Sequence, residues 1–433
     1  MQYLNIIYFF IISLYGYKFL KSDGKIIKGA MNQDILYHYS GTELFWCLTF
    51  STGLLAFSAN VGLDVMALRL LILEIFCIIG LSITKYKPIY SLALKIYILF
   101  LVWMVIGLIY SPSPVYGIRS ILKYLYPFLL CLFASSVVRD IDVFFKASLW
   151  ARCIGAISII LIFIPFIGVL IPGVFWYPTA RAINYISIMI FSLGMFYFSN
   201  KKKENLLYTL LFLLPCGIWT FRTSIMGSMV AIMAFYFIKY KLKSVPIIIG
   251  VIILGIVAVF TIPTIKEKMF FDDTVTIEDF REGKINQDNI NTNYRAYMWK
   301  ILQDKFYENN KIIGSGTGVS QAYMYTHSDE FSGLKIIHSD FIQQKCDNGL
   351  IGLILYGSIA LFIFIDSFCT YWKYKSDNIL RLSAIVAGAS IAGVFVTLYS
   401  ENTVNYSMAT LSMPFGFYGM MLGLRHTEQS EPV

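Results

Sequence analysis

A histidine and an aspartate near the end of a polar segment could carry out acid–base chemistry. His338-Ser339-Asp340 stands just before the apolar run that begins at Gly349. A neutral imidazole can accept a proton from a hydroxyl group because histidine titrates near neutral pH, and Asp340 could orient the ring or share the task. The simpler interpretation is that Ser339 or Asp340 caps the next helix and that His338 is an ordinary surface histidine. Residue types alone do not exclude it.

Four arginines form a second group of candidates: Arg119, Arg181, Arg222 and Arg295. A guanidinium group is always charged, and its planar fork of donors fits the oxygens of a phosphate. Several such groups at one membrane boundary could hold a lipid pyrophosphate. The competing interpretation is that each arginine reaches to interfacial headgroups or pairs with a loop carboxylate. That explanation is less convincing for four arginines than for one.

The sequence shows little that could bind a divalent metal ion, and no cofactor is expected. It contains no paired-histidine arrangement of the kind that binds a divalent transition metal. The neighbouring carboxylates Asp272 and Asp273 could attract a hard cation. They lie in a polar segment, and we interpret them as solvated. No metal ligand is therefore expected in this chain.

The elements that must position these residues are membrane helices. Of the 433 residues, 57% are hydrophobic and 14% are charged, whereas soluble chains have about 45–50% apolar and about 25% charged residues. Runs such as Val245–Pro263 and Gly349–Phe368 match the length of a helix that crosses a hydrocarbon core about 30 Å thick. Inside the bilayer each backbone group must be paired within its own segment, which favours helix.

The hydropathy pattern predicts an all-α polytopic membrane protein with 12–14 transmembrane helices. The candidate spans cover residues 2–20, 43–60, 64–84, 89–110, 121–138, 145–171, 183–199, 205–220, 223–239, 245–263, 349–371, 379–398 and 406–424. The first span is the least secure. It lacks a basic start and a small-residue cleavage site, so a retained helix is expected there rather than a signal peptide.

The basic residues predict how the helices are oriented. The net charge of +9 comes from short clusters between apolar runs, which does not suggest nucleic-acid binding. One alternate set of loops contains Lys85 and Lys87, Arg139, Lys201–Lys203, Lys239, Lys241 and Lys243, Lys373 and Lys375, and Arg425. This side should be cytoplasmic, because Lys and Arg are retained there. The other face then carries the segment 264–347 and the turns near 111–120, 172–182, 220–223 and 399–405.

Residues 264–347 are rich in asparagines and in charged residues of both signs, unlike the apolar runs on either side. This segment divides the chain into three parts. We expect N-terminal transmembrane helices in 1–263, a loop domain in 264–347 and C-terminal transmembrane helices in 348–433. A structureless loop of this length would be unusual. The apolar spacing within Asn293–Asn309 predicts a helix, capped by Thr292 or Asn293. A tight glycine turn is expected at Ile312–Gly318.

Several strings together resemble the O-antigen ligase and polymerase superfamily. His338-Ser339, nine residues, and then Gly349-Leu350-Ile351-Gly352 is similar to its signature at the end of a large periplasmic loop. Three further features are similar in kind and order: Ala180-Arg181-Ala182-Ile183-Asn184, Thr220-Phe221-Arg222-Thr223-Ser224, and Tyr294-Arg295 with Trp299 and the run Gly314–Gly318. The resemblance spans roughly residues 180–360.

The resemblance implies a metal-independent glycosyltransferase of the membrane-embedded GT-C type, with a glycan on undecaprenyl pyrophosphate as donor. An acceptor hydroxyl would attack the anomeric carbon, and the lipid pyrophosphate would leave. His338 and Asp340 would be catalytic, and Arg181, Arg222, Arg295 and Arg119 would bind pyrophosphate. The protein would lie in the bacterial inner membrane with its large loop in the periplasm. A chain-length regulator protein is the implied protein partner, and no nucleic acid is involved.

Within this family the sequence favours a Wzy-type polysaccharide polymerase, which joins lipid-linked repeat units. An O-antigen ligase, which transfers the glycan to the lipid A core, is the alternative. Some ligases carry a threonine where this chain has Gly352, which leans against that alternative. A flippase or transporter of the same glycan is a third possibility, but such proteins usually place charges in mid-membrane. A membrane scaffold whose loop binds a partner protein would leave His338 and Arg295 distant from Arg181 and Arg222.

Overall fold

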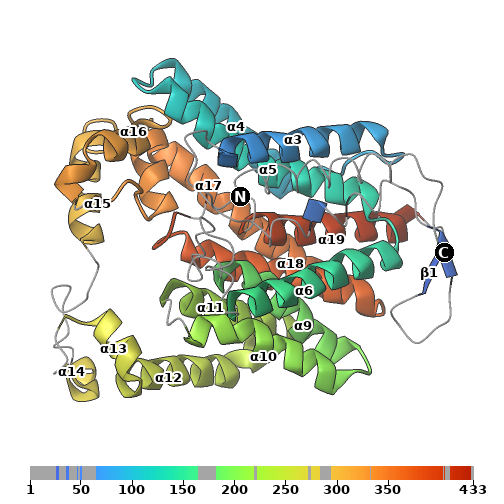
Figure 1. The fold of residues 1–433 in the computed structure, drawn as a ribbon. Coiled ribbons are helices and arrows are strands. Elements are labelled where there is room, and N and C mark those ends of the chain that lie inside the picture. Colours follow the sequence, from blue (N-terminus) through green and yellow to red (C-terminus); the bar gives the residue numbers. More distant parts are fainter. Residues whose placement is uncertain are drawn as a thin grey trace.

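The computed structural model describes residues 26–28, 36–38, 46, 49–50, 65–163, 182–218, 222–271, 275–282, 294–331, 333–402, 404 and 410–430. These parts of the chain are almost entirely helical (Figure 1). The expected span 2–20, most of 43–60, the carboxylates at 272–273 and Arg181 lie outside the described residues. The structure therefore bears on the other spans and on three of the four candidate arginines.

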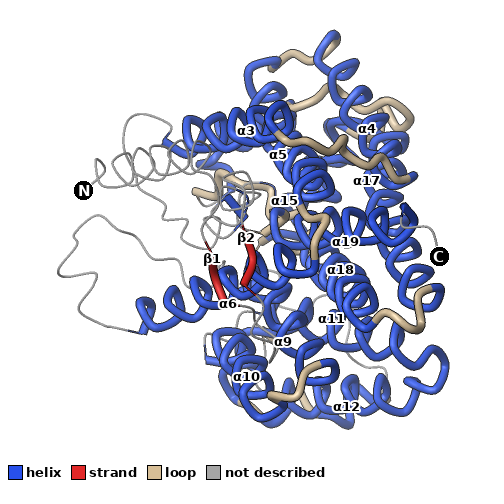
Figure 2. The backbone as a smooth tube through the Cα atoms, turned by 90° about the vertical axis from the view of Figure 1, so that its right-hand side faces the viewer, coloured by secondary structure: helices blue, strands red, loops and turns tan. Residues whose placement is uncertain are grey.

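The described helices follow the predicted order, and Figure 2 shows how few segments between them are not helical. The α-helices are α3 Val65–Ile83, α4 Leu92–Ile109, α5 Pro114–Val137, α6 Ile141–Phe163, α9 Ile186–Phe198, α10 Lys202–Ile218, α11 Arg222–Tyr240, α12 Val245–Thr261, α13 Pro263–Met269, α14 Ile277–Arg281, α15 Arg295–Phe306, α16 Val319–Thr326, α17 Asp340–Lys373, α18 Asn378–Thr397 and α19 Ser412–Ser430. Three 3₁₀ turns accompany them: η2 Ile183–Tyr185, η3 Lys241–Ser244 and η5 Ser328–Phe331. One short antiparallel pair, β1 Ile26–Lys28 and β2 Leu36–His38, is the exception.

Five helical stretches of the described residues are long and apolar enough to cross a membrane: Leu92–Ile109, Pro114–Val137, Arg222–Thr261, Asp340–Lys373 and Asn378–Thr397. The third is a hairpin of two helices, because η3 separates α11 from α12 and Gly255 packs against Met229. The predicted all-α, multi-pass membrane fold is thereby confirmed. The total of 12–14 spans stays a prediction.

Two helices begin well before the spans expected from hydropathy. Helix α5 starts at Pro114 rather than at residue 121, and α17 starts at Asp340 rather than at 349. In both cases the first turns contain polar residues, so a hydropathy window detects only the apolar remainder. The predicted boundary between the loop domain and the last helices therefore falls inside α17, next to Gly349.

The lysine-rich connections gather at one end of the bundle. Arg139 donates a hydrogen bond to the carbonyl of Lys87 at 2.8 Å, and Thr427 donates to the carbonyl of Arg139 at 3.0 Å. At the same end Arg425 pairs with Asp366 at 2.6 Å, and Trp372 donates to the carbonyl of Ile238 at 2.8 Å. The separate basic clusters of the sequence thus form one face. Which compartment this face meets stays a prediction.

Close packing of α11 against α18 positions the opposite end of the bundle. A side chain at Gly393 would collide with the Ala231 methyl group and the Gly227 carbonyl, and one at Gly227 would collide with Thr397. Small residues let two membrane helices approach closely, which gives van der Waals contact without a hydrophobic driving force. The start of α11 is consequently held beside the turn that follows α18.

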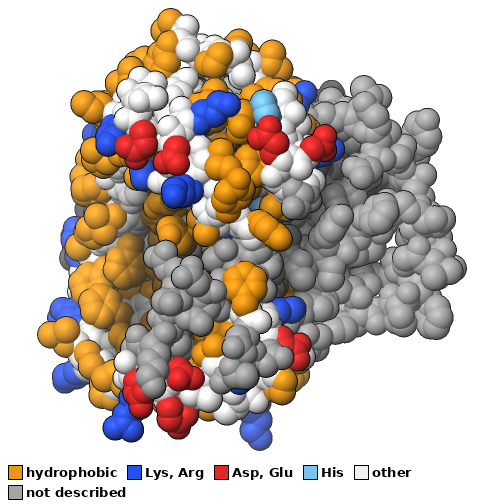
Figure 3. Space-filling model, turned by 90° about the vertical axis from the view of Figure 1, so that its left-hand side faces the viewer, with side chains coloured by type: hydrophobic (Ala, Val, Ile, Leu, Met, Phe, Trp, Pro, Cys, Tyr) orange, Lys and Arg blue, Asp and Glu red, His pale blue; other side chains and the backbone are white. Residues whose placement is uncertain are grey.

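The segment expected to be a loop domain contains short helices with a core of their own. Its buried apolar residues are Met298, Leu302, Met324, Phe331, Ile337, Ile342 and Cys346. The predicted helix within Asn293–Asn309 is confirmed as α15, although its N-cap is Tyr294 and has no side-chain capping bond. Figure 3 looks onto this end of the molecule, where acidic and basic side chains stand among apolar ones. The loop helices α15 and α16 pack on the first turns of α17.

The glycine-rich turn of the loop packs against α17 where that helix breaks at Gly349. Ser315 and Gly316 donate their backbone N–H groups to the carbonyls of Cys346 and Asp347, at 3.0 and 2.9 Å. On the other side of the break, the N–H group of Leu350 donates to the carbonyl of Lys311 at 2.8 Å. The loop therefore supplies the hydrogen bonds that the helix loses at its kink, as buried backbone groups require.

Both segments that meet at this break require glycine, Gly349 in α17 and Gly314 in the loop. Gly349 has φ +64° and ψ −162°, a conformation that residues with a Cβ atom rarely adopt. A Cβ atom there would collide with the Ile312 carbonyl, and one at Gly314 would collide with the Asp347 carbonyl. The glycine run and the Gly-Leu-Ile-Gly string are therefore two halves of one backbone junction. That junction holds the loop domain at a fixed position on the membrane helices.

Candidate active site

His338 lies directly before α17 in a strained backbone conformation. Its φ is +55°, in the left-handed region that few residues other than glycine occupy. The carbonyl of the preceding Ile337 accepts a hydrogen bond from Trp299 Nε1 at 2.7 Å. The following Ser339 caps α17 and accepts a hydrogen bond from the N–H group of Ile342 at 3.2 Å. His338 is thus held from both sides, and residues in such conformations cluster at functional sites.

Asp340 is fully buried at the first position of α17. Its backbone N–H group donates to the carbonyl of Leu398 at 2.9 Å. Its carboxylate accepts a hydrogen bond from the N–H group of Val404 at 3.2 Å. Nearby, the amide of Asn402 donates to Gln343 at 2.7 Å. Asp340 therefore fastens the turn after α18 to the start of α17, and this turn carries the next charged residue of the site.

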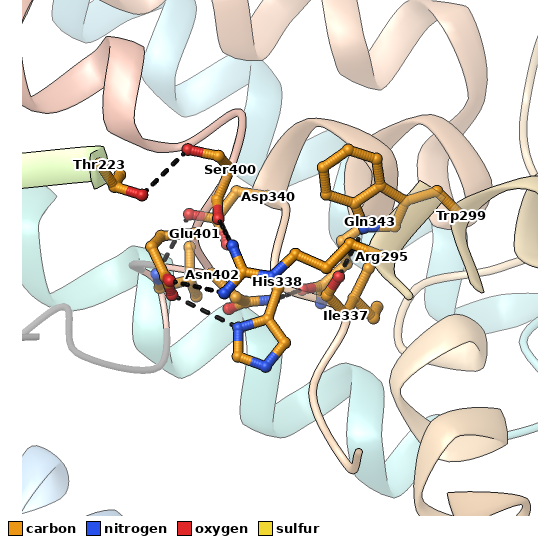
Figure 4. Close-up of polar contacts among 11 residues, drawn as sticks. Thr223, Arg295, Trp299, Ile337, His338, Asp340, Gln343, Ser400, Glu401 and Asn402 are labelled. Atoms are coloured by element: carbon orange, nitrogen blue, oxygen red, sulfur yellow. Dashed lines mark hydrogen bonds and ion pairs between the residues drawn. The ribbon is translucent and has the colours of Figure 1, made fainter. Parts of the chain in front are cut away.

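That residue is Glu401, which joins two of the candidate side chains. Its carboxylate lies 3.2 Å from Arg295 Nη2 and, through the other oxygen, 3.4 Å from His338 Nδ1. The Glu401 side chain is only 8% exposed, while those of Arg295 and His338 are 19% and 20% exposed. The second ring nitrogen of His338 points away from the carboxylate (Figure 4). A buried carboxylate thus connects a guanidinium group to an imidazole with one free edge.

Arg295 reaches this carboxylate from the loop domain. It begins α15, directly after Tyr294, whose φ of +62° is again left-handed. Besides Glu401, the guanidinium group donates to the backbone carbonyl of Ser400. Ser400 also contacts Thr223 through the two hydroxyl groups, which lie 3.2 Å apart. The turn after α18 therefore bridges the loop domain and the first residues of α11, as Figure 4 shows.

Arg222 lies in the same neighbourhood, at the start of α11 and next to Thr223. Thr223 contacts Ser400, the residue to which Arg295 donates, so both arginines lie near the turn after α18. The structure therefore brings together Arg222, Arg295, His338 and Asp340, four of the six residues selected from the sequence. Arg181 lies outside the described residues. Arg119 is exposed on α5, with its guanidinium group 5.6 Å from the ring centroid of Tyr116, and no contact joins it to the others.

Aromatic side chains border the two chain segments that carry the site. The rings of Trp299 and Tyr399 meet edge to face, with centroids 5.8 Å apart. Tyr399 directly precedes Ser400 and is 57% exposed, and Tyr294 and Tyr297, on either side of Arg295, are 69% and 61% exposed. These tyrosines keep both a ring face and a hydroxyl group accessible. Such amphipathic surfaces suit a ligand with apolar faces and polar edges.

Sequence reasoning missed Glu401, although it placed the turn near 399–405 on the same face as the loop domain. The available signal was an acidic residue in a short turn on the face that carries the candidate arginines. A metal-ligating group of three or more His, Cys, Asp or Glu is absent from the described residues. Two carboxylates that are close in the sequence, Asp140 and Asp142, lie at the lysine-rich end and not at the candidate site. There Asp140 accepts a hydrogen bond from the N–H group of Asp142 at the start of α6.

The comparison with known families covers the part of the chain that carries most of this geometry. Residues 207–357 match the O-antigen ligase family. They include Arg222, Arg295, His338 and Asp340, but not Glu401. No curated protein sequence matches the chain. The match supports the O-antigen ligase and polymerase superfamily, as predicted from the sequence motifs, and does not separate polymerases from ligases.

Proposed function

We propose that this protein is a membrane glycosyltransferase that polymerises undecaprenyl-pyrophosphate-linked repeat units on the periplasmic face of the bacterial inner membrane. The observation that carries the proposal is the group formed by His338, Glu401 and Arg295. It combines a base with a free edge, a carboxylate that orients the base, and a cation. This combination fits the transfer of a glycosyl group from a pyrophosphate to a hydroxyl group.

In the proposed reaction an acceptor hydroxyl attacks the anomeric carbon of the donor. A new C–O bond forms, the bond between that carbon and the pyrophosphate oxygen breaks, and the lipid pyrophosphate leaves with the bonding electrons. With Nδ1–H directed at Glu401, the other nitrogen of His338 has a lone pair that can accept the hydroxyl proton. A base oriented by a third group is the general arrangement for activating a weak nucleophile.

The arginines would stabilise the leaving group. Negative charge develops on the pyrophosphate as the bond breaks, and fixed cations in a water-poor site lower the energy of that state. Arg222 lies next to Thr223, which contacts Ser400, and Arg295 donates to the carbonyl of Ser400, so both cations lie near one turn. A pyrophosphate at this turn would be attracted by both. Arg295 donates one hydrogen bond to the Ser400 carbonyl and one to the Glu401 carboxylate. A guanidinium group has five N–H donors in all. The remaining donors can face a phosphate.

A polymerase is our preferred assignment within the superfamily, with an O-antigen ligase as the alternative. Both reactions need the same donor chemistry and differ in the acceptor. The exposed aromatic rings of Tyr399, Tyr294 and Tyr297 beside the site offer stacking surfaces for sugar rings, which suits either acceptor, so the preference for a polymerase rests on the sequence motifs.

The test is an assay of the purified protein with a synthetic undecaprenyl-pyrophosphate repeat unit as the only substrate. A ladder of longer products, formed without any lipid A core, is expected for a polymerase. Product that forms only when lipid A core is added would assign the protein as a ligase. Neither product, together with movement of the intact donor across a vesicle membrane, would assign it as a flippase.

A matched pair of variants links the products to the site. His338→Ala should abolish the ladder, whereas His327→Ala should leave it unchanged. His327 lies in the same loop, at the end of α16, and stacks on Tyr323 rather than contacting Glu401. A ladder of normal length and yield from the His338 variant would exclude the proposed site.

A further inference from the structure

Three cations form a cluster at the lysine-rich end of the bundle, away from the candidate active site. Lys239, near the end of α11, lies over the ring of Tyr197. Arg381, in the first turn of α18, lies 5.7 Å from the ring centroid of the adjacent Phe198. Lys202 is the first residue of α10, which begins four residues after Phe198. Because α11 rises about 1.5 Å per residue, Lys239 is roughly 25 Å from the start of that helix and from the candidate active site.

Among the described residues, carboxylates pair with groups outside this cluster. The charges of Arg381 and Lys202 both act against the charge of Lys239. Within the described parts of the chain, none of the three cations forms an ion pair. The nearby acids have other partners: Glu204 pairs with Arg152 at 3.6 Å and Lys201 at 3.9 Å. Asp377 caps α18 by accepting from two of its backbone N–H groups.

The cluster also contains hydrogen-bond donors that the protein leaves unused. Arg381 Nη2 donates to the hydroxyl group of Tyr371 at 2.8 Å, and its guanidinium group lies 4.5 Å from the centroid of that ring. Arg381 Nε is buried and has no hydrogen-bond partner. Lys239 is half-buried between the rings of Tyr197 and Tyr240. Arg381 Nη1 makes only a long contact of 3.5 Å with the carbonyl of Lys375. Because Arg381 and Lys239 are both partly exposed, an anion at this end could accept hydrogen bonds from the N–H groups at their tips.

We propose that Lys239, Arg381 and Lys202 bind the phosphate group of an anionic phospholipid in the leaflet at the lysine-rich end. The three cations belong to α11, α18 and α10, so the headgroup would tie the ends of three helices together. Several tyrosines and Trp372 surround the cluster, and such aromatic residues lie at the level of lipid headgroups. That position favours a lipid over a free phosphate ion. This inference does not depend on the proposed reaction.

The experiment measures lipid binding to the full-length protein in detergent. Dioleoyl phosphatidylglycerol is the probe, with dioleoyl phosphatidylcholine and inorganic phosphate as comparisons. Phosphatidylglycerol should raise the melting temperature of the wild-type protein more than the other two. Native mass spectrometry of the wild-type protein should show phosphatidylglycerol retained in preference to phosphatidylcholine. Equal effects of both lipids, or an equal effect of inorganic phosphate, would overturn the assignment.

Variants locate the site. The double substitution Lys239→Gln with Arg381→Gln should weaken phosphatidylglycerol binding by about 25-fold, because each cation near an anionic lipid contributes about fivefold. Lys85→Gln with Lys87→Gln is the matched control: both lysines are exposed at the same end of the bundle, on the connection between α3 and α4, and their removal should have a much smaller effect. Equal losses from the two pairs would show general surface attraction and overturn the proposal. If the first pair does not fold, the lipid preference of the wild-type protein still tests it.

Discussion

Oε2 of Glu401 lies 3.4 Å from Nδ1 of His338, although 63 positions of sequence separate the two residues. The distance is long for a hydrogen bond, and contacts between catalytic groups often shorten only when substrate binds. The carboxylate can hold the imidazole in the tautomer that carries a proton on Nδ1. The free nitrogen is then an acceptor, which is the state that a general base requires.

The first prediction concerns the base itself. His338→Ala should lower the rate of polymerisation by about 10²–10⁴-fold, the usual contribution of general-base catalysis, while donor binding stays close to normal. The measurement is single-turnover product formation at several pH values, with His338→Gln as the isosteric variant. A glutamine variant that keeps both most of the rate and the wild-type loss of rate at low pH would exclude His338 as the base.

The second prediction concerns Glu401. Glu401→Gln should lower the rate by about 10²-fold or more, because an amide can donate to Nδ1 and stabilise the wrong tautomer of His338. Glu401→Asp should recover part of the rate. A purely structural role would instead lower the melting temperature of both variants and leave the pH dependence of the remaining activity unchanged. Measuring the pH–rate profile alongside the melting temperature distinguishes the two roles.

The third prediction concerns the arginines. Arg222→Lys and Arg295→Lys should each weaken pyrophosphate binding and reduce activity although the charge is kept, since lysine cannot present a bidentate fork. Inhibition by undecaprenyl pyrophosphate provides the binding measurement. Arg119→Lys is the matched comparison on an exposed arginine and should have a much smaller effect. Unchanged product length and yield in Ala variants of Arg222 and Arg295 would disprove the pyrophosphate role.

The fourth prediction tests the junction between the loop and α17. Gly349→Ala should destabilise the protein by about 1–3 kcal/mol, because its φ and ψ are strained for alanine and the new methyl group would meet the Ile312 carbonyl. Gly357→Ala, in the same helix with open space around it, should be neutral or slightly stabilising. Thermal unfolding in detergent measures both. Equal melting temperatures for the two variants would contradict the role of the junction.

The fifth prediction concerns the orientation of the protein in the membrane. Single cysteines placed at Lys300 in the loop domain and at Lys202 should react differently with an impermeant reagent added to cells with a permeable outer membrane. The loop position should be labelled, and position 202 should be labelled only after the inner membrane is opened, because Lys and Arg are retained in the cytoplasm. The reverse pattern would place the candidate active site in the cytoplasm and refute the proposed use of a periplasmic donor.

The amino-acid sequence alone was enough to predict the fold class and most of the described helices. Long apolar runs admit few alternatives, because unpaired backbone groups are too costly inside a bilayer. It also selected Arg222, Arg295, His338 and Asp340 as candidates, which the structure brings together. Their common feature is polar or charged chemistry at the ends of apolar runs, and that feature is visible without a fold.

Only the tertiary structure revealed how these residues are connected. Glu401 is one acidic residue in a short turn, and its contacts depend on how closely α11 and α18 pack and on how Asp340 holds that turn. The packing of the loop against α17 at Gly349 likewise joins segments that have no shared pattern in the sequence. Hydropathy and residue type are local properties, whereas a contact across 63 positions depends on the packing of all the helices that lie between.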